Sequence, residues 1–309
     1  FKLLFKYLKP NDRLVFNDTK VLNAKLFGKR IRPTTSGIVT AKVEFLLSER
    51  ISKTQWKVYC KPLKKLSILD EVVFSNSLVA RVVSKYQDQC ILEFSKGGVS
   101  LDKEVSFLGQ MPLPPYITRY RQYTRSDNVN YQSIFAKQLG AIAAPTASLH
   151  FDKKLIELIN KKGIKTTFIT LHVGAGTFLP FKVEKIQEHK MHSEWGEITK
   201  TAAQEINSVK RSGGRIIPVG TTALRLLESA TDSCDNLMPF EGETDIFIQP
   251  GYKFKIADGL ITNFHLPNST LLVLVSALIG KKQMRIMYDH AIKQRYRFFS
   301  YGDASLLLP

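Results

Sequence analysis

The sequence predicts an α/β protein, with a mixed, largely parallel sheet flanked by helices, together with a small β-barrel. Two observations lead to this fold class. Between residues 14 and 107, short runs of alternating or β-branched residues follow one another without a helix between them, a pattern typical of small barrels. After residue 150, helical and strand-like segments alternate, which predicts a parallel sheet covered by helices. With 309 residues, 44% of them hydrophobic, the chain is long enough for two such domains.

The N-terminal half begins with an expected helix, "FKLLFKYLKP", residues 1–10. Because the chain starts at Phe1 inside this amphipathic segment, we expect the natural protein to have further residues upstream. Prolines in "GQMPLPPYI" interrupt strand pairing, so a domain boundary is expected near residue 107. Strands are expected in seven runs: "RLVFND", "NAKLFGKR", "AKVEFLLSE", "QWKVYCKP", "DEVVFS", "LVARVVSKY" and "QCILEFS".

The second half predicts helices at residues 151–163, 199–214, 223–230 and 271–279, from apolar residues at helical spacing. The first two end in glycine, a common helix stop signal. Strands are expected in "IKTTFITLHV" and "RIIPV", each followed by a glycine turn. The last apolar run, residues 271–280, is too short to cross a bilayer, which needs roughly 20 residues.

The charge of the chain favours a polyanionic partner. Forty-five Lys and Arg residues against 27 Asp and Glu residues give a formal charge of +18, which favours nucleic acid over a membrane surface. Charge alone does not decide this, since many basic proteins bind no nucleic acid. Three cysteines without a C-x-x-C pair indicate a reducing cytoplasm and argue against a disulfide frame or a cysteine zinc site.

Three histidines share one local pattern. His150 in "APTASLHF", His172 in "TLHVGAGTF" and His265 in "NFHLPNST" each lie among apolar residues beside a segment rich in Gly, Pro, Ser and Thr. Such loops gather beyond the carboxyl ends of parallel strands, where ligands bind. Each histidine alone is better explained as a hydrogen-bonded structural residue. Together they predict a shared polar pocket.

The glycine turns have two readings. "VGTTALRLLES" places Gly220, Thr221 and Thr222 between a strand and a helix, where helix amides can hold a carboxylate, phosphate or ribose oxygen, or where the threonines only cap the helix. Gly174 and Gly176 permit close backbone approach to a ligand or a simple tight bend. Neither turn matches a standard nucleotide fingerprint.

Further candidates lie near both ends of the chain. "VFNDTK" places Asp18, Thr19 and Lys20 between two strands, either as a solvated turn or as a charged pair at a site. Asp303 in "FFSYGDA" is either a cap or a site carboxylate. His189, His192 and Glu194 in "EHKMHSEW" are a weak metal pattern, and we expect no metal site.

The C-terminal stretch "GKKQMRIMYDHAIKQRYRFFSYGD" interleaves cations with aromatic residues. Cations fix phosphates and exposed aromatics stack unpaired bases, so this stretch is a candidate RNA surface. An amphipathic helix with a solvated basic face explains the same pattern. The RNA-binding candidates are Lys281, Lys282, Arg285, Arg295 and Arg297.

Several segments together resemble the S-adenosylmethionine:tRNA ribosyltransferase-isomerase family of queuosine biosynthesis. The match follows the whole chain in order, with one small departure at Ser148, where the family more often has glycine. The segments that carry it are "LVFNDTKVLNAKLFG", "GQMPLPPYI", "YQSIFAKQLGAIAAPTASLHF", "LHVGAGTF", "MHSEW", "VGTTALRLLES", "TDIFIQPGYKFKIADGLITNFHLPNSTLLVLVSALIG" and "YRFFSYGDA".

The resemblance implies an α/β domain of residues 1–26 and 108–309, with an inserted β-barrel of residues 27–107. It implies transfer and isomerisation of the ribosyl part of S-adenosylmethionine onto 7-aminomethyl-7-deazaguanine at the tRNA wobble position. Epoxyqueuosine forms, and adenine and methionine leave. S-adenosylmethionine is then a consumed substrate, so no cofactor is expected. The partner is a tRNA with a GUN-type anticodon, and the protein is expected to be a cytoplasmic monomer without a membrane span.

This chemistry needs a base next to the sulfonium and an acid for the leaving adenine, roles that suit histidine. The catalytic candidates are His150, His172, His265, Asp18 and Asp303. The substrate-binding candidates are Thr19, Lys20, Tyr131, Thr146, Ser148, Gly174, Gly176, Thr177, Gly220, Thr221, Thr222, Arg225, Asn263 and Ser269. A non-catalytic RNA-binding protein also explains the charge, but it does not explain the histidine and glycine loops. A metal-dependent hydrolase is a more distant alternative.

Overall fold

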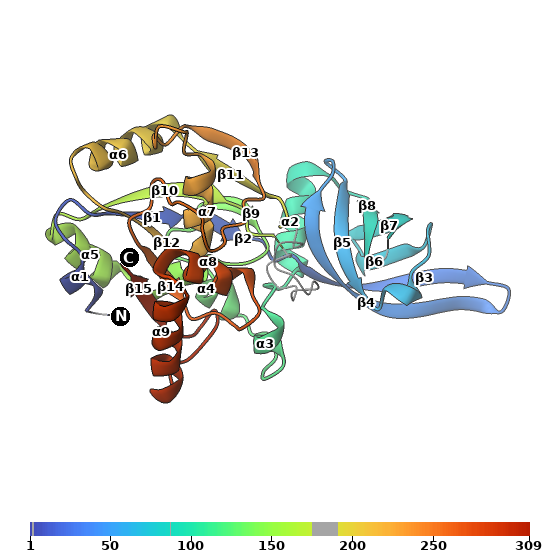
Figure 1. The fold of residues 1–309 in the computed structure, drawn as a ribbon. Coiled ribbons are helices and arrows are strands. Elements are labelled where there is room, and N and C mark those ends of the chain that lie inside the picture. Colours follow the sequence, from blue (N-terminus) through green and yellow to red (C-terminus); the bar gives the residue numbers. More distant parts are fainter. Residues whose placement is uncertain (2, 87, 175–190) are drawn as a thin grey trace. The chain divides into compact units, whose positions relative to one another are not determined.

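The computed structural model describes residues 1, 3–86, 88–174 and 191–309 (Figure 1). The chain forms two compact units. The α/β unit comprises Phe1–Lys20 and Gln132–Pro309, and the barrel unit comprises Val21–Tyr131. The limits expected for an inserted domain, residues 27–107, stay a prediction.

A seven-stranded mixed sheet forms the α/β unit, in the order β13-β11-β10-β1-β12-β14-β15. Its four central strands are parallel: β10 (Lys165–Leu171), β1 (Arg13–Asn17), β12 (Ile216–Val219) and β14 (Leu260–Asn263). The three outer strands run antiparallel to their neighbours: β11 (Glu194–Ile198) next to β10, and the edge strands β13 (Phe240–Thr244) and β15 (Ala304–Leu307). The predicted mixed, largely parallel sheet is confirmed.

Helices cover both faces of this sheet because successive strand residues point to opposite sides. On β1, Val15 packs in one core with α6 (Lys200–Arg211) and α7 (Thr221–Ser229). Its neighbours Leu14 and Phe16 pack in a second core, on the face of α1 (Leu4–Tyr7) and α5 (Lys153–Lys161). Both faces of the central strand are therefore buried, as expected of a parallel sheet.

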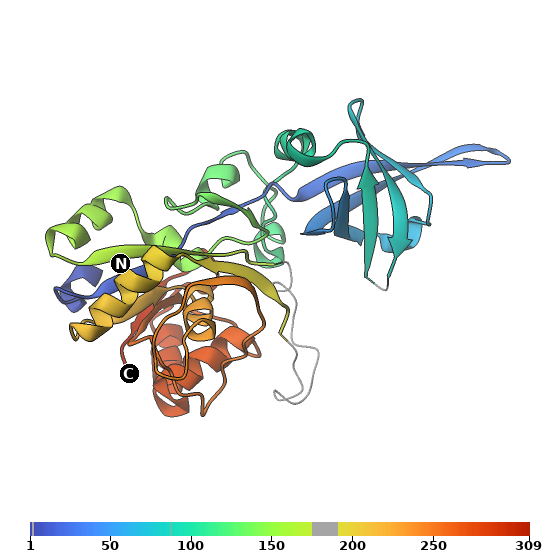
Figure 2. The same ribbon diagram turned by 90° about the horizontal axis from the view of Figure 1, so that it is seen from above.

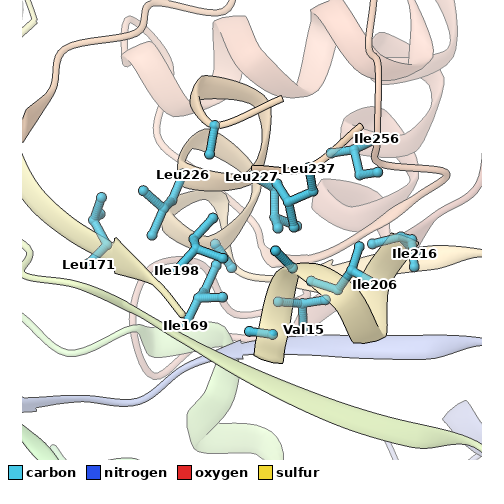
Figure 3. Packing of buried hydrophobic residues seen from close by; sticks show 14 residues of the cluster. Val15, Ile169, Leu171, Ile198, Ile206, Ile216, Leu226, Leu227, Leu237 and Ile256 are labelled. Carbon is cyan, nitrogen blue, oxygen red and sulfur yellow. The ribbon is translucent and has the colours of Figure 1, made fainter. Parts of the chain in front are cut away.

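Figure 3 shows the first core, in which Ile169 and Ile216 of the strands meet Leu226 and Leu227 of α7. A third core joins α8 (Thr270–Ile279) and α9 (Lys281–Lys293) to Leu260. Each fully buried leucine or isoleucine contributes about 1.5–3 kcal/mol of transfer free energy. No helix within the described ranges is long and apolar enough to cross a membrane.

The expected N-terminal helix over residues 1–10 is shorter in the structure, Leu4–Tyr7. Leu8 is already extended, and Pro10 disfavours a helical conformation at the residue before it. A two-stranded sheet of β2 (Thr19–Val21) and β9 (Gln138–Ala141) follows β1. A short 3-10 helix, η2 (Thr146–His150), then leads into α5.

The barrel unit contains a closed six-stranded barrel in the order β3-β4-β5-β8-β7-β6, which confirms the predicted barrel. In both views the β3–β4 hairpin extends beyond the rest of the barrel (Figures 1 and 2). The helix α2 was not predicted. The elements of this unit are β3 (Lys25–Thr34), β4 (Gly37–Arg50), β5 (Gln55–Lys61), η1 (Leu63–Lys65), β6 (Glu71–Ser75), β7 (Leu78–Lys85), β8 (Gln89–Phe94), α2 (Gly98–Leu108), α3 (Pro115–Thr118) and α4 (Asp127–Asn130).

A candidate active site at the carboxyl edge of the parallel strands

The candidate residues gather at one edge of the sheet in the α/β unit. The parallel strands β1, β10, β12 and β14 all end at this edge, so the segments that follow them lie there. The antiparallel strands β11 and β15 begin at the same edge, since Leu171 pairs with Gly196 and Asn263 pairs with Ala304. Topology therefore brings the loops of His172, Gly220 and His265 to the edge where β15 begins.

His172 is held by its ring face and by one ring nitrogen. Its Nδ1 lies 2.8 Å from the Thr19 hydroxyl, and Trp195 stacks on the ring with centroids 5.1 Å apart. A Cβ added to Gly140 would lie 2.5 Å from Nε2 and 2.6 Å from both Cδ2 and Cε1. These nearly equal distances place the glycine over the ring face, not at its edge. Neither Trp195 nor Gly140 was among the sequence candidates.

The Nε2 atom of His172 accepts or donates no hydrogen bond within residues 1, 3–86, 88–174 and 191–309. Burial lowers the pKa of His172 from its ordinary value of 6.5. A lowered pKa favours the neutral ring at pH 7.

Asn17 ties β1 to the neighbouring strand and to α7. Its Oδ1 accepts hydrogen bonds from the backbone of Thr19 (3.1 Å) and Leu171 (3.0 Å). Its Nδ2 donates to the Leu171 carbonyl at 2.9 Å and to the Thr222 hydroxyl at 3.4 Å. This fully buried amide fixes the start of the segment that carries Thr19.

Asp18 is buried and accepts a hydrogen bond from the Thr170 hydroxyl at 2.7 Å. Burial raises the pKa of Asp18 above its usual value, while Thr170 and Lys137 lower it. Lys20, the next cation along the chain, is exposed. The structure thus separates Asp18 from Lys20 by burial, although the two are near neighbours in sequence.

His150, Asn263 and Thr146 form a second hydrogen-bonded group. Asn263 Nδ2 lies 3.1 Å from His150 Nε2, and Thr146 donates to Asn263 Oδ1 at 3.2 Å. Burial lowers the pKa of His150, partly offset by the nearby carboxylate of Asp303. Asp303 itself accepts a hydrogen bond from the Arg297 backbone at 2.8 Å, which lowers its pKa and closes the loop before β15.

His265 is held by Thr262 and Tyr288. Its Nε2 lies 2.8 Å from the Thr262 hydroxyl, and its backbone N–H donates to the Tyr288 hydroxyl at 2.8 Å. Burial lowers the pKa of His265 to about 4. Ser269 caps α8, because its hydroxyl accepts a hydrogen bond from the Leu272 amide at 3.2 Å.

The N-terminus of α7 points its amides toward the same edge. Gly220 has φ +97°, a conformation that disfavours other residues, and its amide donates to the Ile261 carbonyl at 2.8 Å. Among the described residues, no side chain caps the N-terminus of this helix with a hydrogen bond. Amides and the helix dipole make it a suitable place for a carboxylate or a ribose oxygen.

Arg225 is buried and paired with Glu194. Its Nη1 bonds Glu194 Oε2, and its Nε donates to the Ile246 carbonyl at 3.2 Å. The other carboxylate oxygen of Glu194 accepts from the Gly174 amide at 3.0 Å. In the described part of the chain, Arg225 Nη2 and the hydroxyl of the fully buried Ser148 have no hydrogen-bond partner.

The remaining candidates lie elsewhere. Tyr131 is fully buried in the barrel unit, while Gly176, Thr177 and His189 lie outside the described residues. Among the described residues no group of three His, Cys, Asp or Glu side chains could hold a metal ion. The RNA-binding candidates Lys281, Lys282, Arg285, Arg295 and Arg297 are all exposed on α9 or directly after it.

An α/β unit with neutral histidines, hydroxyl groups and a helix N-terminus at the carboxyl edge of its parallel strands is typical of an enzyme acting on a polar small molecule. The queuosine biosynthesis protein family matches residues 1–307 of the chain. The chain therefore belongs to this family, as the sequence motifs predicted.

Similar proteins with a named activity support this assignment to the family. The chain is 52% identical to the S-adenosylmethionine:tRNA ribosyltransferase-isomerase of a Ruegeria species over 306 residues, which cover 99% of this chain and 88% of that one. It is 54% identical to the enzyme of that name from Dinoroseobacter shibae over 302 residues, 98% of this chain and 85% of the other. Its activity class is that of a ribosyltransferase-isomerase.

A solved structure is also similar. The crystal structure of S-adenosylmethionine tRNA ribosyltransferase from Thermotoga maritima has 32% sequence identity and a TM-score of 0.51. The match covers 100% of this chain and 86% of that one.

Proposed function

We propose that the protein transfers and isomerises the ribosyl moiety of S-adenosylmethionine onto 7-aminomethyl-7-deazaguanine at the tRNA wobble position. Epoxyqueuosine forms, and adenine and methionine leave. The observation that carries this proposal is that His172 beside Thr19, His150 beside Asn263 and His265 beside Thr262 all lie at the sheet edge where α7 begins, in a chain of this family.

The reaction needs a base to remove a proton next to the sulfonium, where the positive sulfur stabilises the developing carbanion. His150, His172 and His265 are proposed to divide the acid, base and orienting roles. Their lowered pKa values support this, because a neutral imidazole accepts a proton on one nitrogen and donates a hydrogen bond from the other. Adenine departs more easily when its nitrogen receives a hydrogen bond or a proton, and the incoming amine has to lose one. Asp18 and Asp303 are the carboxylates proposed to assist.

The start of α7 is proposed to hold the methionine carboxylate or ribose oxygens of S-adenosylmethionine. Amides at Thr221 and Thr222 supply hydrogen-bond donors there, and the helix dipole favours an anion. Thr19, Thr146, Gly174 and Ser148 lie on segments that meet the same edge. Arg225 is proposed to help in substrate binding through its Nη2 group, since Glu194 already occupies Nη1.

The decisive test is mass spectrometry of tRNA. The tRNA carrying the deazaguanine precursor is incubated with S-adenosylmethionine and the purified chain, and the wobble nucleoside is measured. A gain of the ribosyl-derived mass, with release of adenine, supports the proposal. Retention of tRNA without a mass change would point to a non-catalytic RNA-binding protein. His172→Gln and His265→Gln variants with unchanged turnover would remove the histidine assignment.

The RNA surface is proposed to include Lys281, Lys282 and Arg285 on α9. Replacing all three by glutamine should lower the salt dependence of tRNA binding, since the slope of log K against log salt reflects the number of phosphates neutralised. An unchanged slope would exclude this surface. The protein is proposed to act as a cytoplasmic monomer without a bound cofactor. Size-exclusion chromatography tests the monomer, and full turnover in chelator is expected because the reaction requires no metal ion.

A further inference from the structure

The side-chain amide of Asn263 uses almost all of its hydrogen-bonding capacity within the protein. The residue is buried at the end of β14, and its Oδ1 accepts a hydrogen bond from Thr146 Oγ1 at 3.2 Å. Its Nδ2 faces the Phe299 carbonyl at 3.1 Å, the Gly302 carbonyl at 3.4 Å and His150 Nε2 at 3.1 Å. Both amide protons are thus directed at acceptors, and little capacity is left for a substrate.

The orientation of this amide is fixed independently of the histidine. Carbonyl oxygens accept hydrogen bonds and cannot donate them. A flipped amide would place Oδ1 against the carbonyl oxygens of Phe299 and Gly302 and would lose both bonds. The group that faces His150 is therefore the NH₂ of Asn263, a donor.

A donor at 3.1 Å requires Nε2 of His150 to accept. Nε2 then carries no proton, and the neutral imidazole has its proton on Nδ1. A second proton, on Nε2, would face the Asn263 amide protons directly. The described residues place no hydrogen bond on Nδ1 of His150, so this N–H remains available to a substrate atom.

The charged groups that act on the ring do not reverse this assignment. Burial is the largest influence on the ring and opposes its protonation, while Asp303 favours the protonated ring and Arg297 opposes it. The Phe1 ring stacks on His150 with centroids 4.9 Å apart. The net effect is a lowered pKa, as expected of a neutral imidazole.

We propose that Asn263 is a positioning residue, which holds His150 as the neutral tautomer with its proton on Nδ1, so that His150 acts as a hydrogen-bond donor and not as the base. The catalytic role of His150 rests on the proposed function, whereas the assignment of its tautomer does not. A neutral histidine of this kind polarises a substrate oxygen or nitrogen without giving up its proton. The base is then His172 or His265.

The test is the tautomer of His150, measured by NMR of the full chain with ¹⁵N-labelled histidine at pH 7.5. Two-bond ¹H–¹⁵N correlations distinguish a protonated Nδ1 from a protonated Nε2, and the His150→Gln variant assigns the signal by its loss. We expect the proton on Nδ1. A proton on Nε2, or on both nitrogens, would overturn the proposal. Since no substrate is present, this result is independent of whether the chain modifies tRNA.

A second variant tests the role of the amide. Asn263→Asp replaces the donor by a carboxylate, so we expect the proton to move to Nε2 and the pKa of His150 to rise in an NMR titration. We also expect kcat to fall at least tenfold with a smaller change in KM, and the pH profile of kcat to shift. Retention of the Nδ1 tautomer in this variant would contradict the proposal.

The matched control is Asn160→Asp, which makes the same change of charge at an exposed position of α5. It should leave the His150 signal, kcat and KM unchanged. If Asn263→Asp does not fold, the wild-type spectrum still decides the tautomer. If the spectrum shows the Nδ1 tautomer but tRNA gains no mass, the proposed function fails while the assignment of the tautomer stands.

Discussion

The buried pair of Glu194 and Arg225 allows a quantitative prediction. Each residue is 6% exposed, so removal of one partner leaves the other charge in a poorly solvated place. Glu194→Leu would leave Arg225 with only the Ile246 carbonyl as a hydrogen-bond acceptor among the described residues. Breaking a buried pair in this way costs about 3–5 kcal/mol, while replacing both partners by apolar residues is often nearly neutral.

The experiment is a double-mutant cycle with Glu194→Leu, Arg225→Met and the double variant. The chain has two tryptophans, Trp56 in the barrel unit and Trp195 in the α/β unit. In a Trp56→Phe background, fluorescence in urea reports on the α/β unit alone. With a slope of about 3 kcal/mol per M, each single variant should lower the urea midpoint by about 1 M or more.

The double variant should be more stable than either single variant. Single variants that each cost less than about 1 kcal/mol, or a double variant as unstable as the sum of the two, would refute the reasoning, because the pair would then behave like a surface ion pair. Lys210→Met is the matched control. It breaks the partly exposed pair with Asp258, and we expect a loss of at most about 1 kcal/mol.

Three further predictions follow from single contacts. Because burial lowers the pKa of His265 from 6.5 to about 4, the unfolded chain binds a proton that the folded chain does not, so stability should fall as the pH falls from about 6.5 toward 4. His265→Gln should flatten this dependence of the urea midpoint, and an equal slope would contradict it. Gly140→Ala places a Cβ 2.5 Å from His172 Nε2, so turnover should fall at least tenfold with an unchanged far-UV circular dichroism spectrum; normal turnover would show that the ring can move aside. Ser269→Ala removes the cap of α8 and should cost about 1 kcal/mol in urea unfolding, and no loss would mean that another group caps the helix.

The sequence predicted the elements whose pattern is local. The strands of the barrel were expected within a few residues of their observed limits, because inward and outward residues alternate along them, as on β5 and β8. The helix α2 was missed, since only Leu101 and Val105 of its residues are buried and it begins with two glycines, Gly97 at the N-cap and Gly98 in the first turn. Strand order was also beyond a local pattern, because β1 pairs with strands far along the chain.

In the candidate site, too, the local features were predictable from the sequence and the tertiary contacts were not. The positions of His172, Gly220 and His265 after strands predicted that they lie at the carboxyl edge of the sheet. Their partners were not predictable in this way. Trp195 reaches His172 only through the antiparallel register of β11, and Glu194 meets Arg225 only because α7 packs on the same side. Such contacts depend on tertiary packing. The roles assigned to these residues stay predictions.

The central position of β1 has a consequence for synthesis. Arg13 pairs with Lys165 and with Ile216, whereas all strands of the barrel lie between residues 25 and 94. At a synthesis rate of about 5–20 residues per second, β12 is made roughly 10–40 s after β1. The barrel can close during that time, while the apolar "LVF" of β1 is exposed to aggregation.

Charged residues flank this apolar segment on both sides: Asp12 and Arg13 precede it, and Asp18 follows it. Such flanking charges oppose aggregation of an exposed strand. In the folded protein Asp12 pairs with Arg215 and Arg13 pairs with Glu205, each at 2.6 Å. Asp12 and Arg13 therefore oppose aggregation of β1 before the sheet forms, and in the folded protein they bind residues near β12 and on α6.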